Sequence, residues 1–304
     1  MQSLREPVEL LLAELDGSRV APQVMPLEFL RKITNDLSDK QKLGTGTFGT
    51  VYKASVYVLN EFENLKRLNH PNIVQLHGYC YEIKRECVEF EGRSVIADKI
   101  YRALCFEYMP NGNLQGHLDD ESRGMDWHTR YKIIKGTCEG LKYLHEGLKT
   151  PMYHLDLKPG NILLDKNMAP KLADFGLSKH VSDNQTRATS NSLGTIRYCP
   201  PEHIERNYFS NKFDIFSLGV VMIEIIAGSE GYRKVAEMPS KEFIHHVQEN
   251  WRERLQEAQG CMTLIYQCRQ VKGCIEIALD CIHPDRTQRP DIGNIISRLN
   301  ETET

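Results

Sequence analysis

The sequence predicts an α+β fold in which strands dominate the first third of the chain and helices dominate the rest. The glycine-rich residues 43–51 (LGTGTFGTV) lie between strand-like flanks, and further strand-like segments follow at residues 73–81 and 104–108. From residue 131 onwards, apolar residues recur at intervals of three and four, which is the spacing of an amphipathic helix. Residues 213–227 are apolar almost throughout and predict a buried helix.

The composition argues against several classes of protein. The 304 residues include 38 basic and 41 acidic ones, so a formal net charge of -3 gives no broad field for nucleic acid or an anionic membrane. Nine cysteines form no C-x-x-C pair, which argues against a zinc site or a disulfide framework. The longest apolar run, residues 215–227, is too short for a membrane span and is interrupted by Glu224. We therefore expect a cytoplasmic protein with reduced thiols, no membrane span and no nucleic-acid partner.

The N-terminal region divides into a leader and a helix. Residues 1–26 contain three prolines and no sustained period, which predicts a poorly ordered leader. Leu27, Leu30, Ile33, Thr34 and Leu37 then recur at helical spacing. They predict a short helix that either packs on the following domain or stands alone on the surface.

Three glycines, Gly44, Gly46 and Gly49, would let backbone N–H groups approach phosphates closely. A G-x-G-x-x-G pattern alone also fits a tight turn or a dinucleotide-binding loop. A dinucleotide-binding loop opens into a helix, whereas residues 50–53 (TVYK) continue as a strand. The sequence thus favours a hairpin. Further on, the charged residues 82–102 predict a solvated hairpin extension, and the turn residues 110–112 (PNG) follow the next strand.

Residues 153–165 (YHLDLKPGNILLD) carry the clearest chemistry in the chain. Asp156, Lys158 and Asn161 can supply a proton acceptor, a cation for phosphate and a magnesium ligand around one phosphoryl group. The tripeptide H-x-D alone also fits a buried histidine beside a capping aspartate. The wider pattern favours phosphoryl transfer.

Three further motifs accompany this one: LADFG at residues 172–176, CPPE at 199–202 and the glycine-rich segment upstream. In this order, the motifs resemble those of the protein kinase family. The stretches ITNDLSDKQKLGTGTFGTVYKA, NHPNIVQLHGYC, FEYMPNGNL and GLKYLHEG resemble plant receptor-like kinases of the cytoplasmic kind. The resemblance covers about residues 27–299 and implies a bilobal fold. It places a small β-rich N-lobe with the hinge at residues 27–109, a larger, mainly helical C-lobe at 110–300, and a tail at 301–304.

The resemblance implies a protein serine/threonine kinase that uses ATP and Mg²⁺ on a protein substrate, with an upstream receptor kinase as a further partner. A peripheral place at the plasma membrane, held through a partner, is compatible with this. In the family pattern Asp156 meets the substrate hydroxyl, Lys158 steadies the γ-phosphate, and Asp214 holds the backbone of the catalytic loop, although Asp214 could also be a helix cap. Asn161 and Asp174 would bind magnesium, Glu202 would pair with Arg289, and the nucleotide contacts would be Gly44, Gly46, Gly49, Val51, Met109 and Leu163.

One part of the family pattern is missing. The acidic residue of the first long helix falls on Glu61, only nine residues after Val51. A turn, a strand of about 5–6 residues and a helix start do not fit that gap, so the third strand and its V-A-I-K lysine are absent. Lys53 is a possible substitute. Three hypotheses remain: an active kinase, a pseudokinase that serves as a binding scaffold, and a sequence that has lost an exon's worth of the small lobe.

Overall fold

The computed structural model describes residues 22–34, 36, 42–46, 49–52, 64–119, 124–181, 187–188, 194–256 and 261–303. Contacts divide the chain into an N-terminal unit, with the described residues up to Asn69 and Gln75–Tyr108, and a C-terminal unit, with His70–Val74 and Met109–Thr304. The resemblance to kinases places residues 70–74 in the N-lobe. They group with the second unit because the N–H of Val74 donates to the carbonyl of Leu172 at 2.9 Å.

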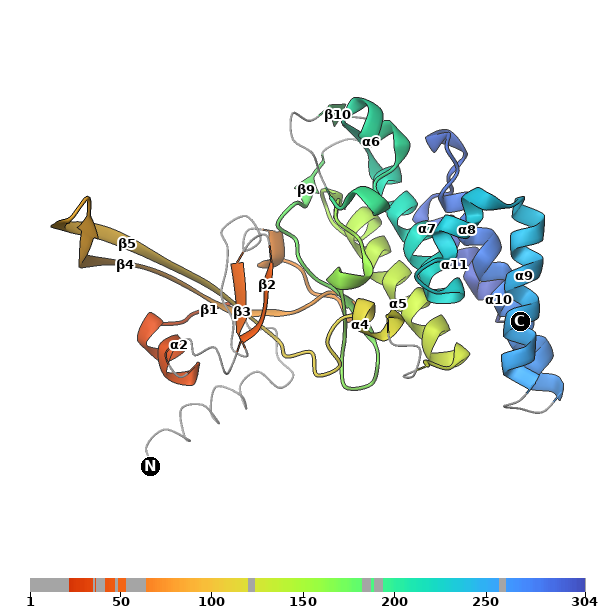
Figure 1. Ribbon diagram of the computed structural model, residues 1–304, viewed down its shortest axis with the longest axis horizontal. Helices are drawn as coiled ribbons and strands as arrows, with labels where there is room; N and C mark the ends of the chain where they lie inside the picture. Colours follow the sequence, from red (N-terminus) through yellow and green to blue (C-terminus); the bar gives the residue numbers. More distant parts are fainter. Residues whose placement is uncertain are drawn as a thin grey trace. The chain divides into compact units, whose positions relative to one another are not determined.

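The main sheet of the N-terminal unit has the strand order β1 (Gln23–Val24), β4 (Leu76–Phe90), β5 (Arg93–Phe106). β4 and β5 form an antiparallel hairpin from the Leu76–Phe106 pair to the Phe90–Arg93 pair (Figure 1). Its two-residue turn consists of Glu91 and Gly92, with φ values of 49° and 71°. Two left-handed residues in a row are what a hairpin turn of this twist requires. The predicted hairpin extension is confirmed.

Helix α2 (Leu27–Ile33) packs on one face of this hairpin. Of the two alternatives for this helix, packing on the following domain is therefore confirmed, and an isolated surface helix is not. Leu27 and Leu30 lie in a buried cluster with Met25, Cys80 and Ala103. The sequence predicts a poorly ordered leader that includes residues 22–26. The structure differs there, because β1 pairs in parallel with β4 and Met25 is buried. A two-residue strand at a sheet edge has no periodicity for sequence analysis to detect.

The glycine-rich segment forms a separate antiparallel hairpin of β2 (Lys42–Gly46) and β3 (Gly49–Tyr52), in which Gly46 pairs with Gly49. Among the described residues, no hydrogen-bonded ladder joins β2 or β3 to the β1–β4–β5 sheet, and no strand lies between β3 and β4 in the sequence. Residues 53–63, which include Lys53 and Glu61, lie outside the described residues. The absence of the third strand therefore remains a sequence-based prediction.

Three helices of the C-terminal unit were predicted from the sequence. Helix α5 (Trp127–Glu146) begins at Asp126, whose carboxylate accepts a hydrogen bond from the N–H of Thr129, and its apolar face is fully buried. Helix α7 (Asn211–Ala227) is buried on all sides. The predicted stripe of α11 (Ile292–Glu301) is buried along its whole length. Helices α5 and α7, α5 and α11, and α7 and α10 (Cys261–Cys281) pack against one another.

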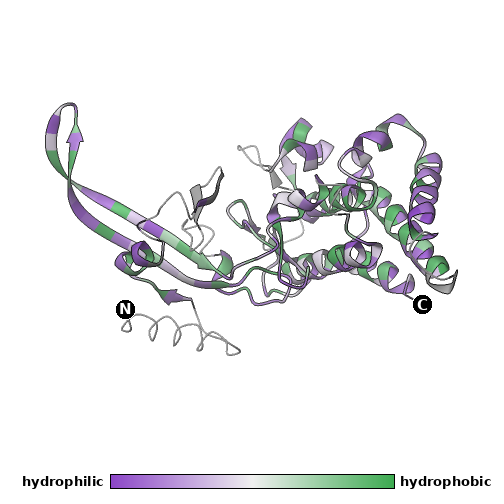
Figure 2. Ribbon diagram, turned by 60° about the horizontal axis from the view of Figure 1, so that its bottom comes forward, coloured by the Kyte–Doolittle hydropathy of each residue, from purple (hydrophilic) through white to green (hydrophobic). Residues whose placement is uncertain are grey.

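The remaining helices and turns of this unit are α4 (Leu114–Leu118), η3 (Pro159–Asn161), η4 (Ile196–Tyr198), α6 (Pro201–Arg206), α8 (Gly231–Glu237), α9 (Ser240–Gln256) and η5 (Arg286–Gln288). Its short strands are β6 (Met152–Tyr153), β7 (Ile162–Leu164), β8 (Pro170–Leu172), β9 (Lys179–His180), β10 (Arg187–Ala188) and β11 (Tyr208–Phe209). Colouring by hydropathy shows apolar residues along the helices that pack inside this unit (Figure 2). In the part of the chain that the structure describes, no helix is both long and apolar enough to cross a membrane.

Candidate functional site

Two short antiparallel ladders bring two loops together in the C-terminal unit. β6 pairs with β9, and β7 pairs with β8. The loop of residues 154–161 therefore runs from the first ladder to the second, and the loop of residues 173–178 returns from the second to the first. At the shared edge, the N–H of Ala173 donates to the carbonyl of Asn161 at 2.9 Å. The motifs HLD and DFG, distant in the sequence, become neighbours in this way.

Asp214, in the first turn of α7, binds the backbone of the first loop. Its fully buried carboxylate accepts hydrogen bonds from the N–H groups of His154 and Leu155, both at 2.8 Å, and lies 2.8 Å from Nε2 of His145. Ser210 caps the helix instead, so the capping alternative for Asp214 does not apply. Leu155 has a φ of 64°, an uncommon conformation for a residue with a side chain, which persists only where its surroundings enforce it.

Asp156 is the centre of the site. One of its carboxylate oxygens, Oδ2, accepts hydrogen bonds from Nζ of Lys158 at 2.7 Å and from Nδ2 of Asn161 at 2.9 Å. The other, Oδ1, accepts from the hydroxyl of Thr195 at 3.1 Å, and Lys158 also donates to that hydroxyl at 2.9 Å. The structure therefore brings together Asp156, Lys158 and Asn161, and it adds Thr195, which sequence reasoning missed because it lies 39 residues away.

The donor set of Asn161 and Asp174 fits a magnesium ion. Nδ2 of Asn161 is engaged by the backbone and side-chain oxygens of Asp156, so the amide oxygen faces the other way. Asp174 has a left-handed φ of 65°, and its Oδ1 accepts a hydrogen bond from the N–H of Gly176 at 3.4 Å. A carboxylate and an amide oxygen are ligands that Mg²⁺ accepts.

The turn around Thr195 is fixed on both sides. Gly194 has a φ of 73°, and a Cβ atom placed there would lie 2.7 Å from the carbonyl oxygen of Leu155. After Thr195, the hydroxyl of Tyr198 donates to the buried carboxylate of Glu224 at 2.9 Å, and Nε of Arg197 lies 2.8 Å from the same carboxylate. Burial raises the pKa of Glu224, whereas these two partners oppose that shift. The turn is thus tied to α7 directly beside Asp156.

The residues proposed to contact nucleotide fall in two groups. Met109 and Leu163 lie in the C-terminal unit, where Leu163 in β7 bridges to Asn113 and the N–H of Gly112 donates to the carbonyl of Met109 at 3.1 Å. The backbones of Gly44, Gly46, Gly49 and Val51 lie in the β2–β3 hairpin of the other unit, and Glu61 is outside the described residues. The structure does not test whether the residues of either group contact nucleotide, so these roles stay predictions.

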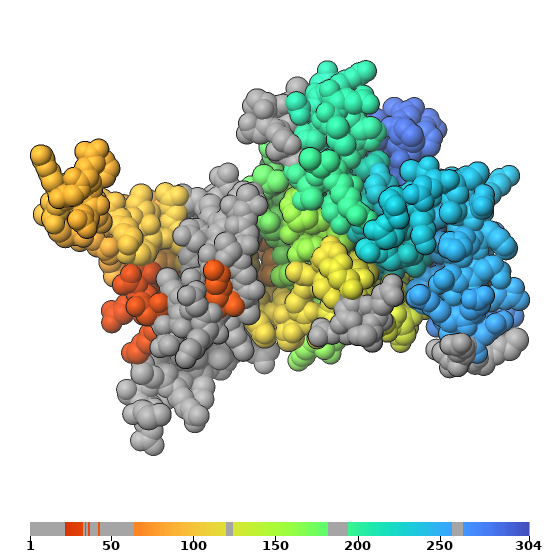
Figure 3. Space-filling view, in the orientation of Figure 1, coloured from red at the N-terminus to blue at the C-terminus, as the bar shows by residue number. Residues whose placement is uncertain are grey.

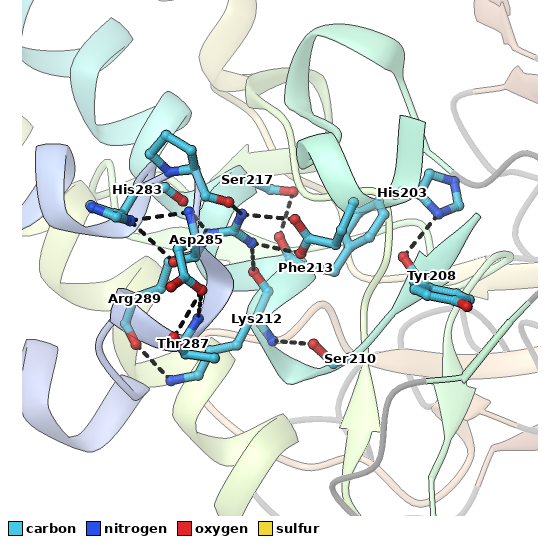
Figure 4. A network of polar contacts seen from close by, with 12 residues as sticks. His203, Tyr208, Ser210, Lys212, Phe213, Ser217, His283, Asp285, Thr287 and Arg289 are labelled. Atoms are coloured by element: carbon cyan, nitrogen blue, oxygen red, sulfur yellow. Dashed lines mark hydrogen bonds and ion pairs between the residues drawn. The ribbon is translucent and has the colours of Figure 1, made fainter. Parts of the chain in front are cut away.

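A polar network behind the site confirms the predicted pairing of Glu202 with Arg289. Two nitrogens of the buried guanidinium donate to the two carboxylate oxygens at 2.7 and 2.8 Å. Arg289 also donates to the carbonyls of His283 and Lys212, and Lys212 donates back to the carbonyl of Arg289 (Figure 4). This network joins α6, α7 and the segment before α11.

The chain belongs to the protein kinase family: the model of the protein kinase domain matches residues 55–299. Its relatives are plant receptor-like kinases. A G-type lectin S-receptor-like serine/threonine-protein kinase of Arabidopsis thaliana is 36% identical over 299 residues, covering 89% of this chain and 33% of that protein. Cysteine-rich receptor-like protein kinase 41 of Arabidopsis thaliana is 32% identical, covering 91% of this chain and 44% of that protein. Cysteine-rich receptor-like protein kinase 10 of Oryza sativa subsp. japonica is also 32% identical, with coverages of 93% and 45%. The chain thus spans a third to under a half of the length of these relatives.

Proposed function

We propose that the chain is a protein serine/threonine kinase that transfers the γ-phosphate of ATP to serine and threonine hydroxyls of a protein substrate. The observation that carries the proposal is the fixed carboxylate of Asp156, which Lys158, Asn161 and Thr195 hold at distances of 2.7 to 3.1 Å. Lys158, two residues after Asp156, is the residue expected in a serine/threonine-specific loop by resemblance.

Each of these groups has a role in the proposed reaction. The substrate oxygen forms a bond to the γ-phosphorus while the bond from that phosphorus to the β,γ-bridging oxygen breaks, and the hydroxyl proton passes to Asp156. Lys158 neutralises charge on the phosphoryl oxygens. Asn161 and Asp174 would hold Mg²⁺, which screens the charge on the phosphates. Thr195 orients the carboxylate of Asp156 and the ammonium of Lys158.

The second candidate is a pseudokinase that binds partners without transferring phosphate. The short interval between Val51 and Glu61 favours it, because that interval cannot contain the third strand and its lysine. Loss of one preorganised electrostatic contact costs about 10²–10³ in rate. Lys53, which lies outside the described residues, is the candidate substitute for the missing cation.

A comparison of two versions of the chain separates these candidates. One is the chain as given, and the other carries an inserted strand containing V-A-V-K after Ala54. We expect measurable transfer of the ATP γ-phosphate to a generic protein substrate, at a rate raised about 10²-fold or more by the insertion. Asp156→Asn should lower either rate by at least about 10²-fold, whereas the exposed Asp119→Asn should not. Equal rates in Asp156→Asn and the parent would reject the kinase proposal. Equal rates with and without the insertion, unaffected by Lys53→Met, would show that the missing lysine does not limit catalysis.

The same proposal includes the subcellular location of the protein. We place it in the cytoplasm, or at the plasma membrane through a receptor kinase partner, because its relatives are named receptor-like kinases. Fractionation of cells that express a tagged chain, with and without a co-expressed receptor kinase, tests this. Recovery in the nucleus or in the secreted fraction would contradict it.

A further inference from the structure

A surface pocket lies beside the turn that carries Thr195. Its volume is about 410 Å³, and its walls come from η4, α8 and the residue that follows α10: Arg197, Tyr232, Arg233, Val235, Ala236 and Ile282. In the space-filling view, teal and cyan atoms of residues 194–256, the segment that includes η4 and α8, lie on the surface of the C-terminal unit (Figure 3). Pockets of roughly 300–1,000 Å³ hold small ligands, so one side chain of a bound peptide fits here.

The pocket lies within reach of a substrate bound at Asp156. The hydroxyl of Thr195 donates to the carboxylate of Asp156 at 3.1 Å, and Arg197 follows two residues later in η4. Two residues of chain span at most about 7 Å. An extended peptide advances about 3.3 Å per residue, so a side chain about two to four residues from the accepted hydroxyl can reach Arg197.

Arg197 gives this part of the surface a positive charge. Its Nε atom lies 2.8 Å from a carboxylate oxygen of Glu224, and its guanidinium also donates to the carbonyl of Ser229. The side chain of Glu224 is 3% exposed, whereas that of Arg197 is 42% exposed. Because the negative partner is buried and the positive partner is not, the ion pair presents its positive end to the surface.

The second arginine of the pocket lies in a different environment. Arg233 is 2.8 Å from the carboxylate of Glu230 and 3.8 Å from that of Glu237. All three side chains are more than half exposed, so solvent and the neighbouring charges screen one another. Arg197 is therefore the group that determines which charge the pocket accepts.

Tyr232 reports the sign of the potential inside the pocket. Burial raises the pKa of its phenol, and the positive charges of Arg197 and Arg289 oppose that shift. Among the described residues, no carboxylate contributes to it. The Tyr232 hydroxyl also forms no hydrogen bond to another residue that the structure describes, which leaves it free to donate to a bound acceptor.

We propose that this pocket binds an acidic side chain of the protein substrate, a few residues from the hydroxyl that is phosphorylated, and that Arg197 determines this specificity. The inference rests on the proposed function and names its substrate class. A glutamate fits the pocket, because its carboxylate accepts hydrogen bonds from Arg197 and Tyr232. Its methylene groups contact the aliphatic side chains of Val235, Ala236 and Ile282. A lysine at the same place meets a like charge, which lowers its affinity.

Peptide binding without ATP tests this specificity separately from catalysis. The probes are fluorescein-labelled peptides with one serine and with Glu, Ala or Lys at a single position, placed at each of the nearest four residues on either side. Fluorescence anisotropy gives each Kd, and we call the Kd of a Lys peptide divided by that of the matching Glu peptide the charge ratio. At one position or more the charge ratio should be about ten.

This measurement also separates the pocket from the proposed enzyme activity. A charge ratio near one at every position would overturn the pocket proposal, whether or not the chain transfers phosphate. A charge ratio near ten in a chain that transfers no phosphate would support the acidic-peptide site and reject the kinase proposal alone.

Single substitutions assign the preference to the pocket. Arg197→Ala should lower the charge ratio to about two or less, and Arg197→Lys, which keeps the charge, should retain most of it. Tyr232→Phe keeps the ring that packs on Phe216 and should lower the ratio about threefold. Arg252→Ala is the matched control, because it removes an exposed arginine that pairs with Glu249 on α9, and it should leave the ratio unchanged.

Arg197→Ala leaves the buried carboxylate of Glu224 without its cation, which can destabilise the chain. The double variant Arg197→Ala, Glu224→Gln removes both charges, so it should fold and show the same low charge ratio. A ratio that stays near ten in the double variant would overturn the assignment to Arg197. Equal losses of affinity for Glu, Ala and Lys peptides in Arg197→Ala would show that Arg197 only supports the turn, and would overturn it as well.

Discussion

The carboxylate of Asp214 accepts a hydrogen bond from the backbone N–H of Leu155 at 2.8 Å, and Leu155 has a left-handed φ of 64°. The uncommon conformation lies one residue before Asp156, so it sets the direction in which the central carboxylate points. Leu155 itself is fully buried. A residue on a helix 59 positions away thus controls the geometry of the site through backbone contacts.

We predict that Asp214→Asn lowers the free energy of unfolding by at least about 2 kcal/mol. The variant replaces one acceptor oxygen with an NH₂ group, which then faces the N–H donor of either Leu155 or His154. An unsatisfied buried group costs about 1–3 kcal/mol. Urea unfolding of parent and variant would measure the change. Asp291→Asn removes an ion pair at an exposed aspartate and should cost no more than about 1 kcal/mol. Similar midpoints for Asp214→Asn and the parent would contradict the assigned support of the loop.

The buried pair of Glu202 and Arg289 should be strongly coupled. Glu202→Ala leaves a buried guanidinium without its carboxylate, which typically costs about 3–5 kcal/mol. The double variant Glu202→Ala, Arg289→Met should cost clearly less than the sum of the single variants, since neither charge remains. The exposed pair of Arg298 and Asp280 is the control, and Arg298→Ala should cost about 1 kcal/mol or less. Additive costs at Glu202 and Arg289 would refute the coupling.

Acidification should destabilise the C-terminal unit through His70. Burial lowers the pKa of His70 below the usual 6.5, and its Nδ1 accepts a hydrogen bond from the N–H of Asn72 at 3.1 Å. An unfolded histidine titrates near 6.5, so below that pH the unfolded chain binds the proton first. The free energy of unfolding should then fall as the pH drops from 6.5 to the pKa of the folded state.

His70→Gln should reduce this pH dependence, because it removes the titrating group. Urea unfolding between pH 7.5 and 5 compares the two slopes, and NMR titration of the His70 ring gives its pKa directly. Burial also lowers the pKa of His203, so some dependence should remain in the variant. A His70 pKa at or above 6.5 would show that the interpretation is wrong.

Nucleotide should stabilise the protein only in the presence of magnesium, because Asn161 and Asp174 offer ligands for the metal rather than for phosphate. A ligand at about 100 times its dissociation constant adds about 2.7 kcal/mol. Melting curves with ATP, with and without Mg²⁺, would measure the shift. Asp174→Asn should abolish the magnesium-dependent part, and Asp119→Asn should retain it. No shift in a folded parent at millimolar ATP would argue against a nucleotide site.

Thr195→Val should lower the rate of phosphate transfer by about tenfold, since it removes the hydroxyl that joins Asp156 and Lys158 at almost unchanged volume. Thr195→Ser keeps the hydroxyl and should restore most of the rate. The measurement is kcat on a generic substrate, using the chain with the inserted strand if the parent is slow. Equal rates for valine and serine would show that the hydroxyl has no part in the reaction.

The sequence predicted those features that local patterns encode. The spacing of Asp156, Lys158 and Asn161 placed them in one site because they lie within six residues of each other. The apolar periods of α5, α7 and α11 predicted their buried faces, and the run of charges predicted the long hairpin.

Other features depend on contacts between distant segments. Thr195 reaches Asp156 across 39 residues, and His145 reaches Asp214 across 69 residues, so no local pattern marks either. The left-handed φ of Leu155 contradicts the preference of leucine and is imposed by its surroundings. β1 has only two residues and no alternation of its own; it forms because an edge of β4 is available.

The position of Cys199 beside the site affects how the protein would respond to oxidants. Its thiol donates to the carbonyl of Thr195 at 3.3 Å, and burial, together with the negative charge of Asp156, raises its pKa to about 11. At pH 7 on the order of one molecule in 10⁴ would then carry the reactive thiolate. Peroxide and electrophilic drugs should therefore react only slowly with the thiol of Cys199. The loop around Asp156 should stay unmodified under oxidative stress that modifies exposed thiols elsewhere on the surface.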